Sequence, residues 1–293
     1  MSEFDPQYGT PVPLRPGLQR LTAPNPSPFT GAGTNSYIIG TDCLMVVDPG
    51  PDSAEHVAAI VRAVAGRPVS HILITHAHRD HVDALPALRA RIDAPTVAEG
   101  PHRASRGLHP GEANPFLGSA DMAFVPDIIV ADGDVLDNGE STVTALGTPG
   151  HTANHLAFGY EDVCLTGDHV MGWSTTVIAP PDGSMKAYMR SLDRLLEIPH
   201  TRFYPGHGDS ILEPRKSVTA MRSHRLMRER AILERLHGPD RTVAALVASL
   251  YTGINPKLKV AAGLSVLAHL EKLAEEGRVR ADGFGVTATW EPG

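Results

Sequence analysis

The sequence predicts an α/β fold with a smaller unit at its C-terminal end. In the first two thirds of the chain, short apolar runs typical of buried strands alternate with stretches whose apolar residues recur at helical spacing. The last part is typical of helices followed by a small hairpin. At 293 residues the chain is longer than a typical single domain. We therefore expect a large domain over residues 1–212, and a linker helix with a small domain over residues 213–293.

The N-terminal elements follow from turn and cap signals. Thr41-Asp42 separates two apolar runs and indicates a hairpin. Ser53 is a suitable N-cap, and Gly66 ends the helical pattern that follows it. In chain order we expect an extended arm over residues 1–29, strands over 34–40 and 43–48, a helix between 53 and 66, a buried strand ending at 75, and a helix from 81 to about 91.

The middle of the chain supplies the second half of the sheet system. Residues 99–120 are irregular and hold His102 and His109, which we expect at the surface; such a long connection is often a functional lid. Pro180-Pro181-Asp182-Gly183 indicates a turn before a helix. The expected elements here are strands at 128–130, 143–146, 156–158 and 163–165, and a helix ending at about 196.

Composition limits the class of protein. The formal charge of −7 argues against a generally basic nucleic-acid binder. The two cysteines, Cys43 and Cys164, lie in apolar runs and are expected to be buried free thiols in a reducing compartment. Residues 1–20 hold no apolar run of signal-peptide length, and no stretch is long enough to span a membrane. We therefore expect a cytoplasmic protein without membrane contact.

Residue types that bind metals follow the apolar run at residues 71–75, in the order His76-Ala77-His78-Arg79-Asp80-His81. Neutral imidazoles and a carboxylate are ligands that zinc prefers. This motif supplies enough ligands for two ions if others arrive from elsewhere in the chain.

Further candidate ligands each end a short apolar run, in or beside a glycine-bearing turn. They are His151 in Thr-Pro-Gly-His-Thr, Asp168 in Thr-Gly-Asp-His, and His207 in Pro-Gly-His-Gly. A lone histidine among the fifteen in this chain would more often be a surface residue than a ligand. The ordered set of motifs is much more specific than any one of them.

Together with Asp48-Pro49-Gly50, these motifs resemble those of the metallo-β-lactamase superfamily over roughly residues 30–212. The resemblance implies a four-layer αββα sandwich and a metal-dependent hydrolase. It also implies two Zn²⁺ per chain, with iron or manganese as alternatives, and a supporting carboxylate at Asp48. The implied ligands are His76, His78 and His151 for the first metal and Asp80, His81 and His207 for the second, with Asp168 bridging.

Two zinc ions about 3.5–4 Å apart can bridge a hydroxide near neutral pH, so no serine or cysteine nucleophile is required. Asp80, His151 and Asp168 are the expected catalytic residues, and Asp80 is expected to orient the hydroxide or pass its proton. His155 and His169 lie beside assigned ligands, and contact with a ligand, contact with substrate and simple packing stay open for both.

The C-terminal pattern predicts one long helix over residues 213–236 with an excess of arginine. Arg222, Arg225 and Arg228 are the expected contacts if this helix frames an anionic polymer, although a solvated helix face is the commoner meaning. Helices at 243–251, 258–260 and 264–276 and strands after 277 and at 286–290 resemble the winged-helix tail of β-lactamase-like proteins that include an endoribonuclease. The balanced charge of this tail argues against sequence-specific DNA binding.

The substrate is left open by the core motifs. The resemblance of the tail favours a phosphodiester in single-stranded RNA, and the alternatives are a thioester, ester or lactone, as in the glyoxalase and lactonase branches. A mononuclear iron persulfide dioxygenase is a further alternative. A regulator with a vestigial site is disfavoured because every ligand position is filled. Lys186 and Tyr188 approach the second metal only if their loop folds inward, and we expect a solvated lysine. The sequence does not fix the oligomeric state.

Overall fold

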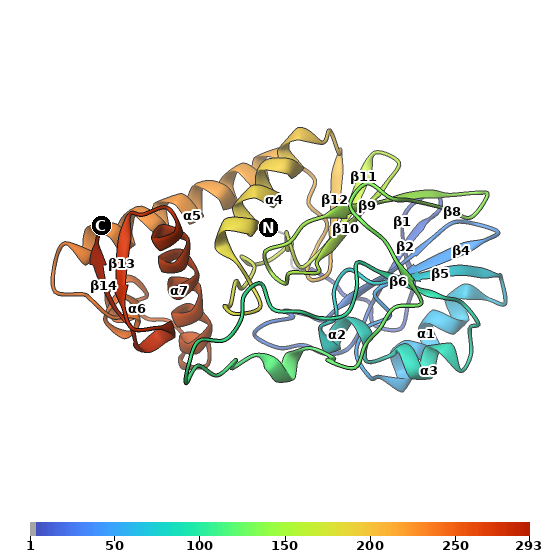
Figure 1. Cartoon of the computed structure of the whole chain (residues 1–293). Helices are drawn as coiled ribbons and strands as arrows, with labels where there is room; N and C mark the ends of the chain where they lie inside the picture. Colours follow the sequence, from blue (N-terminus) through green and yellow to red (C-terminus); the bar gives the residue numbers. More distant parts are fainter. Residues whose placement is uncertain (1–3) are drawn as a thin grey trace.

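The computed structural model describes residues 4–293 and contains two stacked β-sheets with helices on their outer faces (Figure 1). In the first sheet the strands follow chain order, antiparallel from β1 to β4 and parallel from β4 to β7. Its strands are β1 Val12–Arg15, β2 Leu18–Thr22, β3 Asn35–Ile39, β4 Leu44–Val47, β5 Val69–Leu73, β6 Thr96–Ala98 and β7 Ile128–Ile129.

The second sheet has the order β12-β11-β10-β9-β8, and only the β11–β12 pair is parallel. Its strands are β8 Val135–Asp137, β9 Thr142–Gly147, β10 Leu156–Tyr160, β11 Val163–Gly167 and β12 Arg202–Pro205. A crossover through a helix precedes β12, which is what a parallel neighbour of β11 requires.

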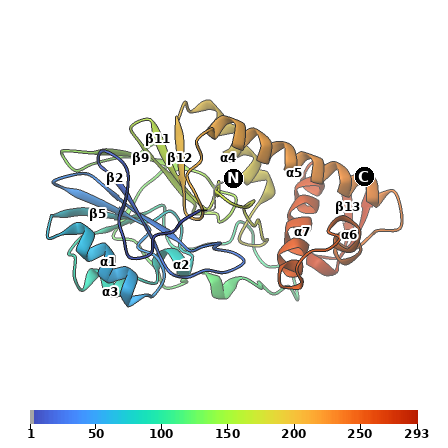
Figure 2. The same ribbon diagram turned by 180° about the vertical axis from the view of Figure 1, so that it is seen from behind.

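Helices cover both outer faces, and their bounds follow local signals. Ser53 and Ser184 cap α1 and α4 by accepting a hydrogen bond from a backbone N–H of the first turn. The helices of this part are α1 Ala54–Val64, α2 Arg79–Val82, α3 Leu85–Arg89, the short 3₁₀ helix η1 Leu117–Ser119, α4 Met185–Glu197 and α5 Pro214–Leu236. Two opposite views place α1 and α3 on one side of the sheets and α4 with α5 on the other (Figures 1 and 2).

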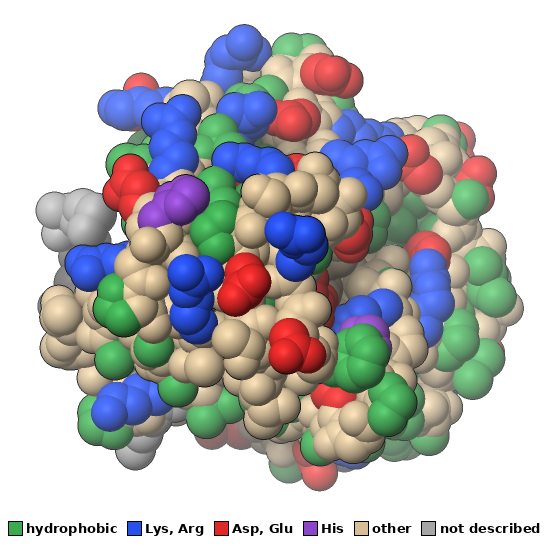
Figure 3. All heavy atoms as spheres, turned by 60° about the vertical axis from the view of Figure 1, so that its left-hand side comes forward, with side chains coloured by type: hydrophobic (Ala, Val, Ile, Leu, Met, Phe, Trp, Pro, Cys, Tyr) green, Lys and Arg blue, Asp and Glu red, His purple; other side chains and the backbone are tan. Residues whose placement is uncertain are grey.

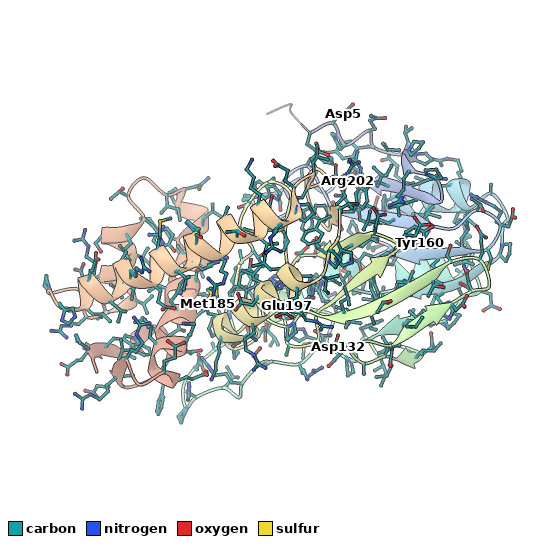
Figure 4. The ribbon with its side chains drawn as sticks, turned by 90° about the horizontal axis from the view of Figure 1, so that it is seen from above. Asp5, Asp132, Tyr160, Met185, Glu197 and Arg202 are labelled. Carbon is teal, nitrogen blue, oxygen red and sulfur yellow. The ribbon has the colours of Figure 1, made fainter. Side chains whose placement is uncertain are left out.

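Apolar side chains fill three interfaces between these four layers. In β3, Tyr37 and Ile39 point into the space between the sheets, while Ile38 packs on the other side with α1. On the outer face of the second sheet, α4 contributes Tyr188 and Leu192 to a third cluster. Seen from above, α4 runs from Met185 to Glu197 beside α5 and against the strands (Figure 4). The αββα sandwich expected from the sequence is confirmed.

The C-terminal unit packs against the second half of α5. Its core joins Ile232 and Leu236 of α5 to Leu246, Leu270 and Trp290. Its elements are α6 Val243–Leu250, η2 Pro256–Leu258, α7 Lys259–Glu275, β13 Val279–Asp282, η3 Gly285–Thr287 and β14 Thr289–Pro292. Since α5 contacts α4 as well as this unit, the predicted division between residues 212 and 213 stays a prediction.

Two expectations about elements in the N-terminal part are wrong. The N-terminal arm contains β1 and β2, which form one edge of the first sheet; Leu18 and Leu21 are fully buried, and the edge position tolerates Pro13. Residues 1–3 of that arm lie outside the described residues. The expected helix after His81 is two short helices, because the Ala84 N–H donates to the Gly50 carbonyl instead of continuing α2.

The other differences concern the sheet and the tail. The 128–130 strand belongs to the first sheet, and β8 was not expected. The two expected helices at 258–260 and 264–276 are the single α7, which runs through Gly263. The final strand begins at Thr289. Cys43 and Cys164 are free thiols, as expected; Cys164 is buried, whereas Cys43 is only partly buried, contrary to the expectation. Among residues 4–293, no helix combines the length and apolarity needed to cross a bilayer.

Candidate metal centre

The seven predicted ligands converge at the carboxyl ends of the strands. His76 follows β5, His151 follows β9, Asp168 follows β11 and His207 follows β12. The remaining three belong to the N-terminal end of α2, of which His78 is the N-cap residue. Because β4 pairs with β5 and β11 with β12 in parallel, chain segments that are far apart in sequence leave the two sheets at one edge.

The first group contains His76, His78 and His151. His78 Nδ1 lies 3.0 Å from His76 Nε2 and 3.1 Å from His151 Nε2, so three imidazole nitrogens face one point. Asp168 Oδ2 lies 3.7 Å from His151 Nε2 and 4.0 Å from His76 Nε2.

The second group contains Asp80, His81 and His207. Asp80 Oδ2 lies 3.3 Å from His207 Nε2 and 3.6 Å from His81 Nε2. The other oxygen of Asp168, Oδ1, is 3.3 Å from His207 Nε2 and 3.4 Å from His81 Nε2. One carboxylate therefore faces both groups, an oxygen to each. The seven side chains thus lie together as two groups of ligand-type atoms, and their role as metal ligands stays a prediction.

Two buried atoms of this cluster fit a bound cation. Among the described residues, Asp168 Oδ1 and His81 Nε2 are buried without a hydrogen-bond partner. Leaving a buried carboxylate oxygen unpaired is costly, and a metal ion would satisfy both atoms at once. The set of imidazoles and carboxylates, with ring nitrogens converging on two points, suits zinc and similar first-row ions.

The ligand rings are oriented through their other nitrogens. His81 Nδ1 lies 2.9 Å from Asp48 Oδ2, His151 Nδ1 lies 2.7 Å from the Val177 carbonyl, and His207 Nδ1 lies 3.1 Å from the Gly33 carbonyl. These acceptors keep a proton on the outer nitrogen, so that the inner one carries the lone pair a metal needs. Asp48, expected from the sequence as a supporting carboxylate, holds this position.

Charge differs between the two groups in the metal-free protein. Burial and the neighbouring imidazoles lower the pKa of His76, and burial with the nearby His151 lowers that of His78 to about 3. Burial also acts on His207, but Asp168 and Asp80 outweigh it and raise its pKa to about 10. The same carboxylates raise the pKa of His81.

His155 and His169, which the sequence left ambiguous, have different surroundings. His155 Nε2 accepts a hydrogen bond from the Asp168 backbone N–H at 3.1 Å, and its Nδ1 lies 2.8 Å from Thr148 Oγ1. It therefore positions the carboxylate shared by both groups. His169 is fully buried and its ring packs 4.6 Å from that of Tyr188. Tyr188 itself is buried, and Lys186 is an exposed residue paired with Glu275.

A pocket of about 210 Å³ opens over the cluster, with His78, Asp80, His151, Asp168 and His207 in its floor. Its walls are largely apolar and come from segments that carry no metal motif. The remaining lining residues are Phe29, Thr30, Phe116, Ser119, Met171, Thr176, Val177, Ala179 and Asp182.

The expectation that His102 lies at the surface is wrong. His102 is 8% exposed, and its Nε2 lies 3.4 Å from Asp182 Oδ1. Asp182 also accepts hydrogen bonds from Asn114, and Ser105 donates to its carbonyl. The irregular segment 99–120 is thereby held across the mouth of the pocket. In the sequence Asp182 is recognisable only as a turn residue, so its contacts with the segment 99–120 could not be predicted.

Of the three arginines singled out in α5, Arg225 and Arg228 serve internal contacts and Arg222 forms a surface ion pair. Arg225 is 4% exposed and donates to the Thr176 carbonyl and to Ser265 Oγ. Arg222 pairs with Asp193, and the Arg228 guanidinium lies over the Tyr251 ring. Of the three arginines proposed to contact an anionic polymer, Arg225 is therefore not available to one.

Comparison with known proteins decides the family. Residues 29–207 match the sequence model of the metallo-beta-lactamase superfamily, which is more than half of the chain. The chain belongs to the metallo-beta-lactamase superfamily. Residues 242–290 match the beta-lactamase associated winged helix domain, as expected for the C-terminal tail. Membership makes this a metal-binding protein of a hydrolase family.

Similar proteins within the superfamily extend over nearly the whole chain. A beta-lactamase-like protein 2 homolog of Caenorhabditis elegans is 29% identical, over 91% of this chain and 87% of that protein. The atrochrysone carboxyl ACP thioesterase nsrC of Aspergillus novofumigatus is also 29% identical, over 93% and 83%. A metallo-beta-lactamase family protein of Thermus thermophilus of known structure is 26% identical, with a TM-score of 0.74 over 96% of this chain and 100% of that one.

Proposed function

We propose that this superfamily member is a dinuclear metal-dependent hydrolase that cleaves ester or thioester bonds of acyl substrates. The observation that carries the dinuclear part is the position of Asp168, whose two carboxylate oxygens each face a separate group of ligand atoms. The first ion would be held by His76, His78 and His151, and the second by Asp80, His81 and His207. Zinc is the ion that this donor set favours.

When bound, two such ions would polarise the scissile carbonyl and activate a water at neutral pH. Asp80 borders the pocket and keeps 28% of its side chain exposed, so its carboxylate can take a proton from the attacking water and pass it to the leaving group. Thr34 Oγ1 lies 3.3 Å from Asp80 Oδ2 and fixes that carboxylate. His151 and Asp168 form part of the floor of the pocket, and the apolar walls exclude bulk water.

The lining of the pocket favours an acyl substrate over RNA. Among the described lining residues there is no lysine or arginine, while Phe29, Phe116, Met171 and Val177 form apolar walls. A polynucleotide needs several basic contacts to its phosphates. On the face formed by the C-terminal unit, acidic side chains lie between the basic ones (Figure 3). The name of the fungal relative, a thioesterase, also supports an acyl substrate.

A comparison of several substrates tests this proposal. The metal-quantified protein would be assayed on a short-chain thioester, a p-nitrophenyl ester, a lactone, a β-lactam and a labelled single-stranded RNA. We expect the thioester or ester to be turned over fastest, and Asp80→Asn to lower that rate by about 10²–10⁴-fold. Asp93→Asn, at an exposed aspartate between α3 and β6, is the matched control and should leave it unchanged. Efficient cleavage of RNA without acyl hydrolysis would contradict the proposal.

A further inference from the structure

A large open cavity lies in the C-terminal unit, apart from the ligand cluster. It measures about 1100 Å³ and is bounded by α6, α7, η3 and the segment 110–115. Its walls include Val247, Tyr251, Leu264 and Leu267. Of the described lining residues only Glu112 and Lys259 carry a charge, and Glu112 is paired with Arg106. The cavity therefore offers an apolar surface to a ligand.

A third cavity lies between this one and the pocket at the metal centre, and it has wall residues in common with both. This intermediate cavity of about 330 Å³ shares Phe29, Met171 and Val177 with the pocket over the ligands. The same intermediate cavity shares Tyr251 and Ile254 with the large one. The shared residues mean that the three spaces lie next to one another, in order from the ligand cluster to the C-terminal unit.

The walls between these spaces are fixed by the C-terminal unit. The Tyr251 ring lies 4.2 Å below the Arg228 guanidinium, which also donates to the Leu250 carbonyl at 3.0 Å. The segment 110–115 is held by Arg106, whose guanidinium bridges Glu112 and Glu271 of α7. The cavity is thus built by contacts between the segment 110–115 and the winged-helix unit.

We propose that the large cavity binds the apolar chain of an acyl substrate whose ester or thioester bond lies over the ligand cluster, an inference that rests on the proposed function. The winged-helix unit then selects substrates by chain length and polarity. The occupant is argued from the adjacency of the three spaces: a chain that starts at the scissile carbonyl would meet Phe29 and Val177, then Tyr251 and Ile254, and then the large cavity. Burial of each methylene should raise kcat/KM about fourfold until the cavity is filled.

Filling the cavity tests the assignment. Ala248 lines it from α6 and is exposed, so Ala248→Trp adds bulk to the cavity without disturbing the core. The matched control is Ala220→Trp, at an exposed alanine of α5 that lines none of these three cavities. The substrates are straight-chain acyl thioesters from two to twelve carbons, and dodecanoate binding is measured separately by calorimetry.

We expect kcat/KM to rise with chain length in the unaltered protein and in Ala220→Trp. In Ala248→Trp the gain should disappear for long chains, while the two-carbon rate, metal content and circular dichroism stay unchanged. Dodecanoate should bind the unaltered protein and not Ala248→Trp. An unchanged dependence on chain length in Ala248→Trp would overturn the assignment. So would loss of a dimer in that variant without an effect on long chains, because the cavity would then be an interface between copies.

Failure of the proposed function has a different signature. Absence of hydrolysis for every ester and thioester in the metal-loaded protein would reject the reaction. The binding arm would still decide the cavity: dodecanoate binding that Ala248→Trp abolishes supports an apolar-chain site, and equal binding in both proteins rejects it.

Discussion

Asp48 should control the affinity of the second metal without touching a metal itself. Its carboxylate is 2% exposed and accepts hydrogen bonds from the Thr75 N–H and hydroxyl at 2.8 and 2.7 Å, and from His81 Nδ1 at 2.9 Å. In Asp48→Asn the amide can keep both contacts to Thr75, because a hydroxyl accepts as well as donates. The contact to His81 cannot survive in its present form, since two N–H groups would face each other.

Asp48→Asn can relieve this clash in two ways, and both weaken metal binding by the second group. Either a buried N–H is left unpaired, or His81 moves its proton to Nε2, the atom that faces Asp168. The cost of an unpaired buried group is about 1–3 kcal/mol, which agrees with the loss of about 10- to 100-fold in metal affinity that supporting residues typically cause. Calorimetric titration of the metal-stripped protein with Zn²⁺ should show one binding step weakened by this factor and the other nearly unchanged. Equal affinities in Asp48→Asn and the control Asp93→Asn, or equal loss at both steps, would refute the reasoning.

Three further predictions follow from single contacts. His207→Ala should lose one metal per chain while the first group keeps its ion; equal loss of both would refute the partition, and elemental analysis decides. Burial lowers the pKa of His56 to about 4 in the folded protein, so the imidazole binds a proton more tightly in the unfolded chain. The stability that the neutral imidazole contributes is present above pH 6.5 and is lost as the pH falls toward 4. Between pH 7 and 5 the free energy of unfolding measured in urea should therefore fall by about 2 kcal/mol in the unaltered protein. His56→Gln should not show this fall. Arg225→Ala should cost about 2–4 kcal/mol because it leaves the Thr176 carbonyl unpaired, against less than about 1 kcal/mol for Arg222→Ala; similar losses would contradict the burial argument.

The site was more predictable than the elements around it. Predicted ligands such as His76 and His207 carry a strong local signal, a histidine directly after an apolar run and beside a turn, and the fold brings the ends of these runs together. The strands β1 and β2 gave a weaker signal, because Pro13 and the polar residues of an edge hairpin are typical of a loop as well. The pairing of β2 with β3 and the burial of Leu18 and Leu21 show that this segment belongs to the sheet.

The walls of the pocket depend on contacts that no local pattern records. Asp182 is part of a turn in sequence, and its contacts with His102 and Asn114 exist only because the lid segment crosses it. Arg225 lies in a helix whose sequence is typical of a solvated face, yet the C-terminal unit covers it. Residues whose role depends on a segment distant in sequence need the tertiary structure to be recognised.

The central claim is that one carboxylate, Asp168, joins two metal sites in a single chain. Elemental analysis of the purified protein and of Asp168→Ala, normalised to protein concentration, tests it most directly. We predict two ions per chain in the unaltered protein, and loss of metal from both sites in Asp168→Ala with the fold retained by circular dichroism. A single iron per chain with no zinc would contradict the account and favour the mononuclear dioxygenase. Retention of the metal at one site in Asp168→Ala would also contradict the account.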